Sequence, residues 1–166
     1  IISAKNNKKF YSWVDLGSEY RAPELSSALV FAQLMKVKKI QDSRKKNWNI
    51  FKELIEKQKT NKFYLIKPSP NTTSSYHLFV LIFKSLKLAN KFKNFMQSKN
   101  VAATFHYVPL HKSNMGKKIC KYKLPITENI YNRVVRLPLF PDMTKKEINK
   151  IVSLIKIFLK ETQVFS

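Results

Sequence analysis

Three side chains that often bind ligands lie close together around one proline. His106, Tyr107 and His111 occur in the segment Phe-His-Tyr-Val-Pro-Leu-His, where Pro109 separates the two histidines. Two histidines five residues apart across a proline do not share a helix face, and no cysteine or carboxylate lies beside them, so we expect no metal site. A strand that ends in polar aromatic residues and turns at a proline is typical of a pocket rim. Isolated histidines are also often structural, so the spacing alone leaves both interpretations open.

Few other residues offer catalytic chemistry. Cys120 is the only cysteine, and since no base or orienting group lies beside it, we expect an ordinary thiol rather than a nucleophile. No order of serine, histidine and aspartate indicates a triad, and no pair of carboxylates indicates acid–base catalysis. Arg21 is one of only four arginines among 32 basic residues, and its guanidinium could bind a carboxylate or phosphate in two-point fashion. A structural ion pair explains Arg21 equally well.

The composition excludes several classes of protein. Gly17 and Gly116 are the only glycines, so neither a dinucleotide-binding turn nor a Walker-type phosphate loop can be present. A single cysteine excludes an intrachain disulfide and a multi-cysteine metal cluster. The longest apolar run, Leu78 to Phe83, is far shorter than the ~20 residues that span a bilayer. With no signal-peptide pattern either, we expect a cytoplasmic protein without a membrane partner.

The net charge of +22 raises one alternative, a basic module that binds nucleic acid. Arginine, which nucleic-acid sites favour for its planar fork, is scarce here, and the lysines are scattered from Lys5 to Lys160. A solvated lysine surface is therefore the simpler interpretation, and nucleic acid is an unlikely partner.

The pattern of apolar residues predicts an α/β fold. No proline or glycine interrupts residues 24–58, and the apolar spacing predicts one long helix there, preceded by Pro23 at its first turn. Strands are expected at 76–83, 102–107 and 134–140. Helices are expected near 88–100, near 128–133, and after a capping box formed by Thr144 and Glu147. This order predicts a long helix followed by a three-stranded sheet covered by helices.

Three segments in this order resemble the DegT-type nucleotide-sugar aminotransferases. The first runs from Tyr11 to Leu25 (YSWVDLGSEYRAPEL), the second from Phe105 to His111 (FHYVPLH), and the third from Arg136 to Phe140 (RLPLF) with Thr144 after it. The motif WVDLGS within the first segment is most similar to the branch of the family that makes dTDP-4-amino-4,6-dideoxygalactose from a 4-keto-6-deoxyglucose nucleotide.

The resemblance implies the C-terminal part of a fold-type-I transferase that uses pyridoxal 5'-phosphate (PLP). Residues 1–22 would be the connecting segment from a large domain, 23–60 a long interdomain helix, and 61–166 a small α/β domain. Such enzymes move an amino group from glutamate to a sugar ketone, here a dTDP-4-keto-6-deoxy sugar used for surface polysaccharide. The lysine that forms the Schiff base with PLP would lie before Ile1, so the resemblance implies no catalytic residue within this chain, which alone would be inactive.

The resemblance also implies roles for individual residues. Ser18 and Glu19 fall where the family contacts the PLP phosphate; an Asn of the family aligns with Glu19, whose carboxylate would repel a phosphate, so Ser18 is the better donor. Tyr20 and Arg21 would bind substrate, the arginine holding the carboxylate of the amino donor. The three residues of the second segment, His106, Tyr107 and His111, would line the entrance for the nucleotide sugar.

The resemblance further implies a homodimer that shares its active sites between subunits. Two alternatives stay open from the residues alone: the basic nucleic-acid-binding module, and a decayed gene fragment without a stable fold.

Overall fold

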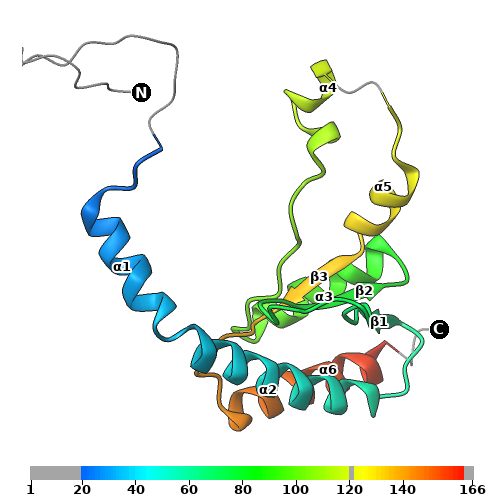
Figure 1. Cartoon of the computed structure of the whole chain (residues 1–166). Helices are drawn as coiled ribbons and strands as arrows, with labels where there is room; N and C mark the ends of the chain where they lie inside the picture. The colour runs from blue at the N-terminus through cyan, green and yellow to red at the C-terminus, as the bar shows by residue number, and fades with distance from the viewer. Residues whose placement is uncertain (1–19, 120–121, 163–166) are drawn as a thin grey trace, which may run out of the picture. The chain divides into compact units, whose positions relative to one another are not determined.

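The computed structural model describes residues 20–119 and 122–162, which belong to two compact units, residues 1–37 and 38–166 (Figure 1). We describe each unit by itself. Ser18, Glu19 and Cys120, which the sequence singled out, lie outside the described residues.

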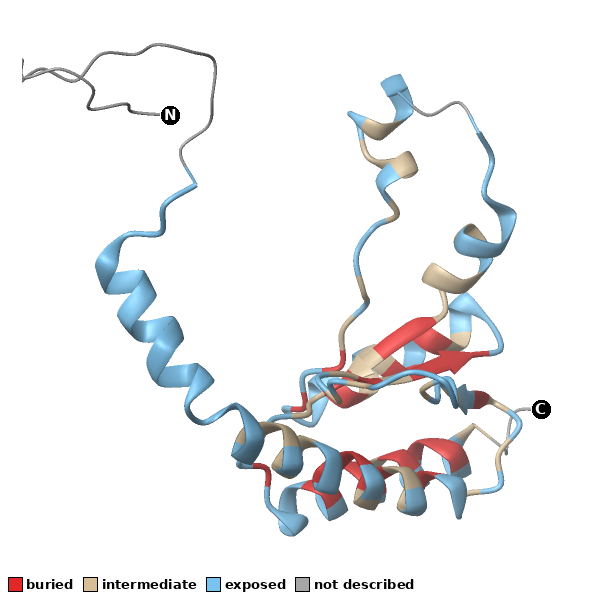
Figure 2. Ribbon diagram, viewed as in Figure 1, coloured by how far each residue is buried: buried red, intermediate tan, exposed pale blue. Residues whose placement is uncertain are grey.

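The described part of the first unit is mainly one helix, α1 (Glu24–Leu34). Pro23 precedes it, and the amide of Ser27 donates to the Pro23 carbonyl at 2.9 Å, which closes the first turn. None of its residues is buried, and it exposes large apolar side chains including Leu25, Leu29 and Phe31 (Figure 2). Within the described part of its own unit, no residue packs on these apolar side chains.

The single helix expected over residues 24–58 is wrong at one point, because the structure divides it into α1 and α2 (Val37–Glu56). At the break the amide of Lys36 donates to the carbonyl of Gln33 at 3.0 Å, three residues back instead of four. Such a bond tightens the turn and interrupts the α-helical ladder. No proline or glycine lies between α1 and α2, so the sequence does not predict this break.

The second unit contains a three-stranded antiparallel sheet in the order β1-β2-β3. Its strands are β1 (Phe63–Leu65), β2 (Phe79–Phe83) and β3 (Val134–Leu137). Leu81 in the central strand pairs with Leu65 on one side and Val135 on the other.

Two strand predictions are corrected by this sheet. The strand expected at 102–107 is absent; Thr104 alone forms an isolated bridge to Arg136, and the third strand is β1, which the sequence pattern did not predict. The strand expected from residue 76 begins only at Phe79, because Tyr76 has a φ of 48°, a left-handed conformation that extended strands do not adopt.

Three helices pack on one face of the sheet: α2, α3 (Leu86–Ser98) and α6 (Lys145–Glu161). In Figure 2 the buried residues gather between these helices and the strands. Phe51 of α2 stacks on Phe79 of β2 with ring centroids 4.2 Å apart, and Phe92 of α3 meets Phe158 of α6 edge-on at 5.1 Å. Burial of these aromatic side chains is the main source of stability for the unit.

The predicted capping box of α6 is confirmed. Thr144 Oγ1 accepts from the amide of Glu147 at 3.2 Å, and Glu147 Oε2 accepts from the amide of Thr144 at 2.7 Å. These hydrogen bonds from Thr144 lower the pKa of the Glu147 carboxyl. The helix buries one apolar stripe, which consists of Ile148, Ile151, Val152, Ile155, Phe158 and Leu159.

The remaining helices are short. They are η1 (Leu110–Lys112), a 3₁₀ turn; α4 (Gly116–Ile119); and α5 (Pro125–Tyr131). Among the described residues no helix is long and apolar enough to cross a membrane. The same residues contain no group of three or more histidine, cysteine, aspartate or glutamate side chains arranged to hold a metal ion.

Candidate functional site

A mainly apolar groove of about 600 Å³ lies on the second unit. One wall is the segment 106–110, and the other consists of α5 and the start of β3. Its lining residues are His106, Tyr107, Val108, Pro109, Leu110, Ile126, Thr127, Ile130, Tyr131 and Val134. The structure thus brings His106 and Tyr107, both predicted site residues, into one cavity.

Arg136 of β3 fixes the beginning of the first wall. Its backbone exchanges two hydrogen bonds with Thr104, at 2.7 and 3.1 Å, and its Nε donates to the carbonyl of Phe105 at 3.1 Å. The guanidinium carbon also lies 5.9 Å from the centre of the Tyr107 ring, which is a cation–π contact. One arginine therefore holds the backbone before the wall and contacts the aromatic ring on it.

His106 is half-buried, and its ring lies 4.9 Å from that of Tyr107. Burial lowers the pKa of the His106 imidazole, and the positive charge of Arg136 and the nearby His77 lower it further. Its Nδ1 is buried and has no hydrogen-bond partner in the described part of the chain. A neutral imidazole carries one donor and one acceptor nitrogen, so a ring nitrogen of His106 that faces the groove could form one hydrogen bond with a hydroxyl group, such as that of a sugar.

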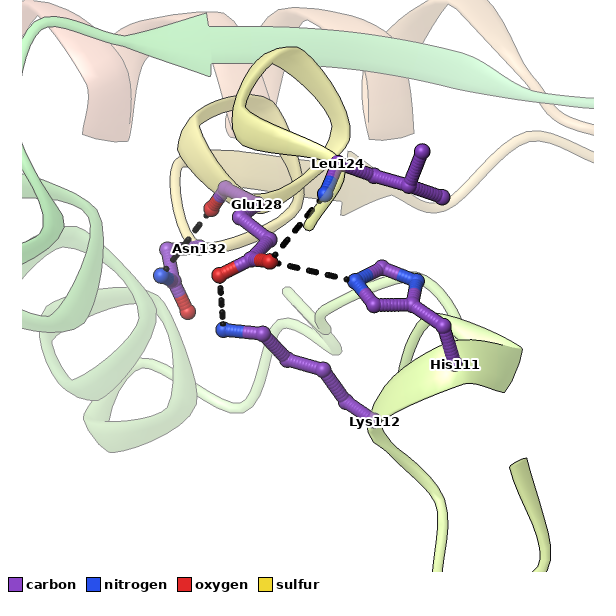
Figure 3. Close-up of polar contacts among 5 residues, drawn as sticks. All are labelled: His111, Lys112, Leu124, Glu128 and Asn132. Atoms are coloured by element: carbon purple, nitrogen blue, oxygen red, sulfur yellow. Dashed lines mark hydrogen bonds and ion pairs between the residues drawn. The ribbon is translucent and has the colours of Figure 1, made fainter. Parts of the chain in front are cut away.

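The Glu128 carboxylate, which does not line the groove, connects α5 to η1 (Figure 3). Glu128 of α5 accepts from Lys112 Nζ at 2.7 Å, from His111 Nε2 at 3.3 Å and from the amide of Leu124 at 3.4 Å. The amide side chain of Asn132 donates to the Glu128 carbonyl at 3.2 Å. The third predicted residue, His111, therefore faces this carboxylate.

The other predicted site residues lie elsewhere in the chain. Tyr20 and Arg21 belong to the first unit, where both are exposed, and Tyr20 has 91% of its surface accessible. Ser18 and Glu19, assigned to the cofactor, lie outside the described residues. Within the second unit, the structure brings His106 and Tyr107 of the second segment into one groove and places His111 beside Glu128.

Sequence reasoning missed the groove wall formed by α5. Ile126 and Ile130 line the groove four residues apart, a spacing that places them on the same helix face. That spacing is visible in the sequence, but nothing in it says which neighbour this face meets. The sequence marks Glu128 only as the start of an expected helix, because its partners His111 and Lys112 lie 17 and 16 residues earlier in the chain.

The groove is suited to an uncharged, partly aromatic or sugar-like group. Among the described residues that line the groove, His106 alone could carry a positive charge on its side chain, and its lowered pKa disfavours the charged form. The lining therefore does not fit a phosphate group, and we assign none of it to the phosphate of a cofactor. Tyr107 and Tyr131 offer aromatic faces that can stack on a planar ring.

This arrangement of helices on a three-stranded sheet matches a part of several solved aminotransferases. The PLP form of a putative sugar aminotransferase, Spr1654 from Streptococcus pneumoniae, matches with a TM-score of 0.77 at 17% identity, over 94% of this chain and 40% of that one. PseC from Helicobacter pylori, an aminotransferase involved in the biosynthesis of pseudoaminic acid, matches with a TM-score of 0.81 at 18% identity, over 95% of this chain and 43% of that one. The expected fold class is thereby confirmed.

The sequence itself defines the family. Residues 2–156 match the model of the DegT/DnrJ/EryC1/StrS aminotransferase family, and the chain belongs to this family. It is 25% identical over 153 residues to the dTDP-3-amino-3,6-dideoxy-alpha-D-galactopyranose transaminase of Aneurinibacillus thermoaerophilus, which covers 92% of this chain and 40% of the relative. The chain thus spans about two fifths of the length of the relatives it matches. The comparisons give no support to the alternative of a nucleic-acid-binding module.

Proposed function

We propose that this chain is the substrate-binding part of a PLP-dependent nucleotide-sugar transaminase. The observation that carries the proposal is the family match over residues 2–156, together with a groove that holds His106 and Tyr107 of the second family segment on one wall. The proposed overall reaction converts glutamate and a keto sugar into 2-oxoglutarate and an amino sugar. PLP, when bound, would carry the amino group between these two substrates.

We propose a dTDP-4-keto-6-deoxy sugar as the acceptor. The WVDLGS segment supports the 4-keto sugar, whereas the relative from Aneurinibacillus is named for a 3-amino product. In the groove, the rings of Tyr107 and Tyr131 would stack on the base or the sugar, and the neutral His106 would bind a hydroxyl group. The nucleotide phosphates would lie outside this groove because its lining offers them no cation.

Arg21 is our candidate for the carboxylate of glutamate. A guanidinium can bind a carboxylate through two parallel hydrogen bonds, which a lysine ammonium cannot reproduce. In the product of the longest open reading frame that contains this chain, Arg21→Lys should therefore raise KM for glutamate more than KM for the sugar. An equal rise in both constants would contradict this assignment.

The domain arrangement and the assembly are part of the same proposal. Residues 1–22 would connect to a large domain, residues 23–60 would link the two domains, and the protein would be a homodimer with shared active sites. The apolar side chains exposed along α1 support this arrangement, because a helix without buried residues gains stability when another body covers it.

The test begins with the coding sequence before Ile1. If an open frame supplies a lysine-bearing large domain, its product should be incubated with PLP, glutamate and either a 4-keto or a 3-keto dTDP sugar. We expect 2-oxoglutarate and an amino sugar of matching mass with the 4-keto substrate. A product that binds PLP but releases no 2-oxoglutarate with either sugar would refute the proposed function.

A further inference from the structure

The Glu128 carboxylate connects the two walls of the groove without lining it. Glu128 belongs to α5, in the second wall, whereas His111 and Lys112 belong to η1, whose first residue, Leu110, is the last of the first wall. Its Oε2 accepts from Lys112 and its Oε1 from His111 and from the amide of Leu124 (Figure 3). One side chain therefore bonds the end of the first wall to the second.

These contacts are partly shielded from water. The side chain of His111 is only 9% exposed, and those of Glu128 and Lys112 are 31% and 32% exposed. Partial burial reduces screening by water and makes each hydrogen bond to the charge more favourable. The hydrogen bond from Lys112 is the largest cause that lowers the pKa of Glu128, and the same bond raises the pKa of Lys112.

The ionised carboxylate also determines which nitrogen of His111 carries hydrogen. An ionised carboxylate only accepts hydrogen bonds, so Nε2 of His111, 3.3 Å from it, must be the donor. Lys112 is held in turn by Tyr131, since its Nζ lies 5.3 Å from the centre of that ring. The carboxylate thus holds the side chains of His111 and Lys112 and orients them toward α5.

The first wall depends on its two ends. Before it, Arg136 holds Thr104 and Phe105; after it, η1 is held by Glu128. Between these anchors, residues 106–108 make no backbone–backbone hydrogen bond to any described residue. The positions of His106 and Tyr107 are therefore set by the anchors rather than by a sheet.

We propose that Glu128 is a positioning residue, which fixes the wall carrying His106 and Tyr107 at its distance from α5. The importance of this for substrate rests on the proposed function, whereas the effect on the wall itself does not. Because Glu128 acts through His111 and Lys112, its loss should move the wall without removing any side chain from the groove.

The test compares Glu128→Gln with Glu56→Gln in the full 166-residue chain. Glu56 is a matched control because it forms an ion pair with Lys67 at 2.6 Å, away from the groove and more exposed. Both substitutions remove one negative charge and one ion pair and keep the size of the side chain. A third variant, Lys112→Met, removes one partner of Glu128 and leaves the carboxylate in place.

The first readout is NMR of the histidine and tyrosine rings. We expect His111 to lose its single Nε2–H form in Glu128→Gln, and the signals of His106 and Tyr107 to shift or broaden. Lys112→Met should do the same to a smaller extent, and Glu56→Gln should leave these signals unchanged. Unchanged His106 and Tyr107 signals in Glu128→Gln would overturn the proposal. So would equal changes throughout the chain, which would indicate a general loss of stability.

The second readout separates this proposal from the proposed function. Titration with dTDP-glucose, followed by the His106 and Tyr107 signals, should show binding that Glu128→Gln weakens severalfold and Glu56→Gln does not. If the wild-type chain binds no dTDP-glucose while the ring signals respond as expected, the proposed use of the groove fails and the positioning role stands. If binding is equal in all variants, the positioning role is refuted.

Discussion

Asn47 offers a sharp test of how α2 is anchored to the rest of the second unit. It is the buried polar residue in the described core, 6% exposed. Its Nδ2 donates to the carbonyl of Phe140 at 3.2 Å and to that of Pro141 at 3.1 Å. Ser43, one turn earlier, donates to the same Pro141 carbonyl. Asn47→Asp keeps the size of the side chain but replaces this donor with an acceptor.

The expected loss of stability follows from these two bonds. Each hydrogen bond contributes about 0.5–1.5 kcal/mol, and a buried acceptor left without a donor costs about 1–3 kcal/mol. A buried charge facing two carbonyl oxygens adds to this, so we expect a loss of about 3 kcal/mol near neutral pH. A protonated carboxyl can donate one bond, so the loss should be smaller in acid.

The pH dependence has a definite sign. Burial and the two carbonyl dipoles raise the pKa of the introduced carboxyl in the folded state above its unfolded value of about 3.9. The variant should therefore be close to the wild type below that value. Its deficit should grow by about 1.4 kcal/mol per pH unit as the pH rises to the folded pKa, and then level off.

Urea unfolding followed by tryptophan fluorescence measures this loss. The control is Asn49→Asp, the same chemical change on the same helix at an exposed position. We expect the Asn47 variant to lose about 3 kcal/mol more than this control near neutral pH, and a much smaller difference near pH 4. A difference below about 1 kcal/mol at neutral pH, or one that does not change with pH, would refute the anchoring role of the amide.

Three further outcomes are expected. Arg136→Met should raise the pKa of His106 without restoring its ordinary value, because burial is the larger cause; an NMR titration that shows no rise would contradict the placement of the guanidinium. Gly116→Ala should disturb the turn around it, since a Cβ there would overlap the Leu110 carbonyl, and limited proteolysis should cut this loop faster than in wild type; unchanged cleavage would refute that close approach. Thr144→Ala should cost about 1 kcal/mol of unfolding free energy by removing the cap of α6, whereas a loss near zero in urea unfolding would mean that the cap contributes nothing.

The elements with strong local signals could be predicted from the sequence. The capping box and apolar stripe of α6 identify its start and its buried face, because both depend on residues within a few positions of one another. Local apolar patterns also predict α3 and the apolar run that forms β2. That strand begins later than expected because Tyr76 has a left-handed backbone conformation. The family segments likewise identified His106 and Tyr107, which share the groove.

The secondary-structure predictions are wrong where a segment's conformation depends on residues far away in the sequence. The segment 102–107 has a strand-like composition but pairs only through Thr104, where Arg136 contributes backbone and side-chain hydrogen bonds. β1 has only three residues, too few for a recognisable alternation, and it forms because Leu81 and its neighbours offer an edge. The break between α1 and α2 has no sequence signal.

The sequence by itself determined the family, the elements with local signals, and which side chains could meet a ligand. Only the tertiary structure decided that α5 faces the segment 106–110 and that Glu128 binds His111 and Lys112, which lie 17 and 16 residues earlier in the chain. The physical reason is range: capping and amphipathic spacing act within one or two helical turns, whereas a groove wall or an ion pair requires chain closure over many residues, and local patterns do not encode which segments meet.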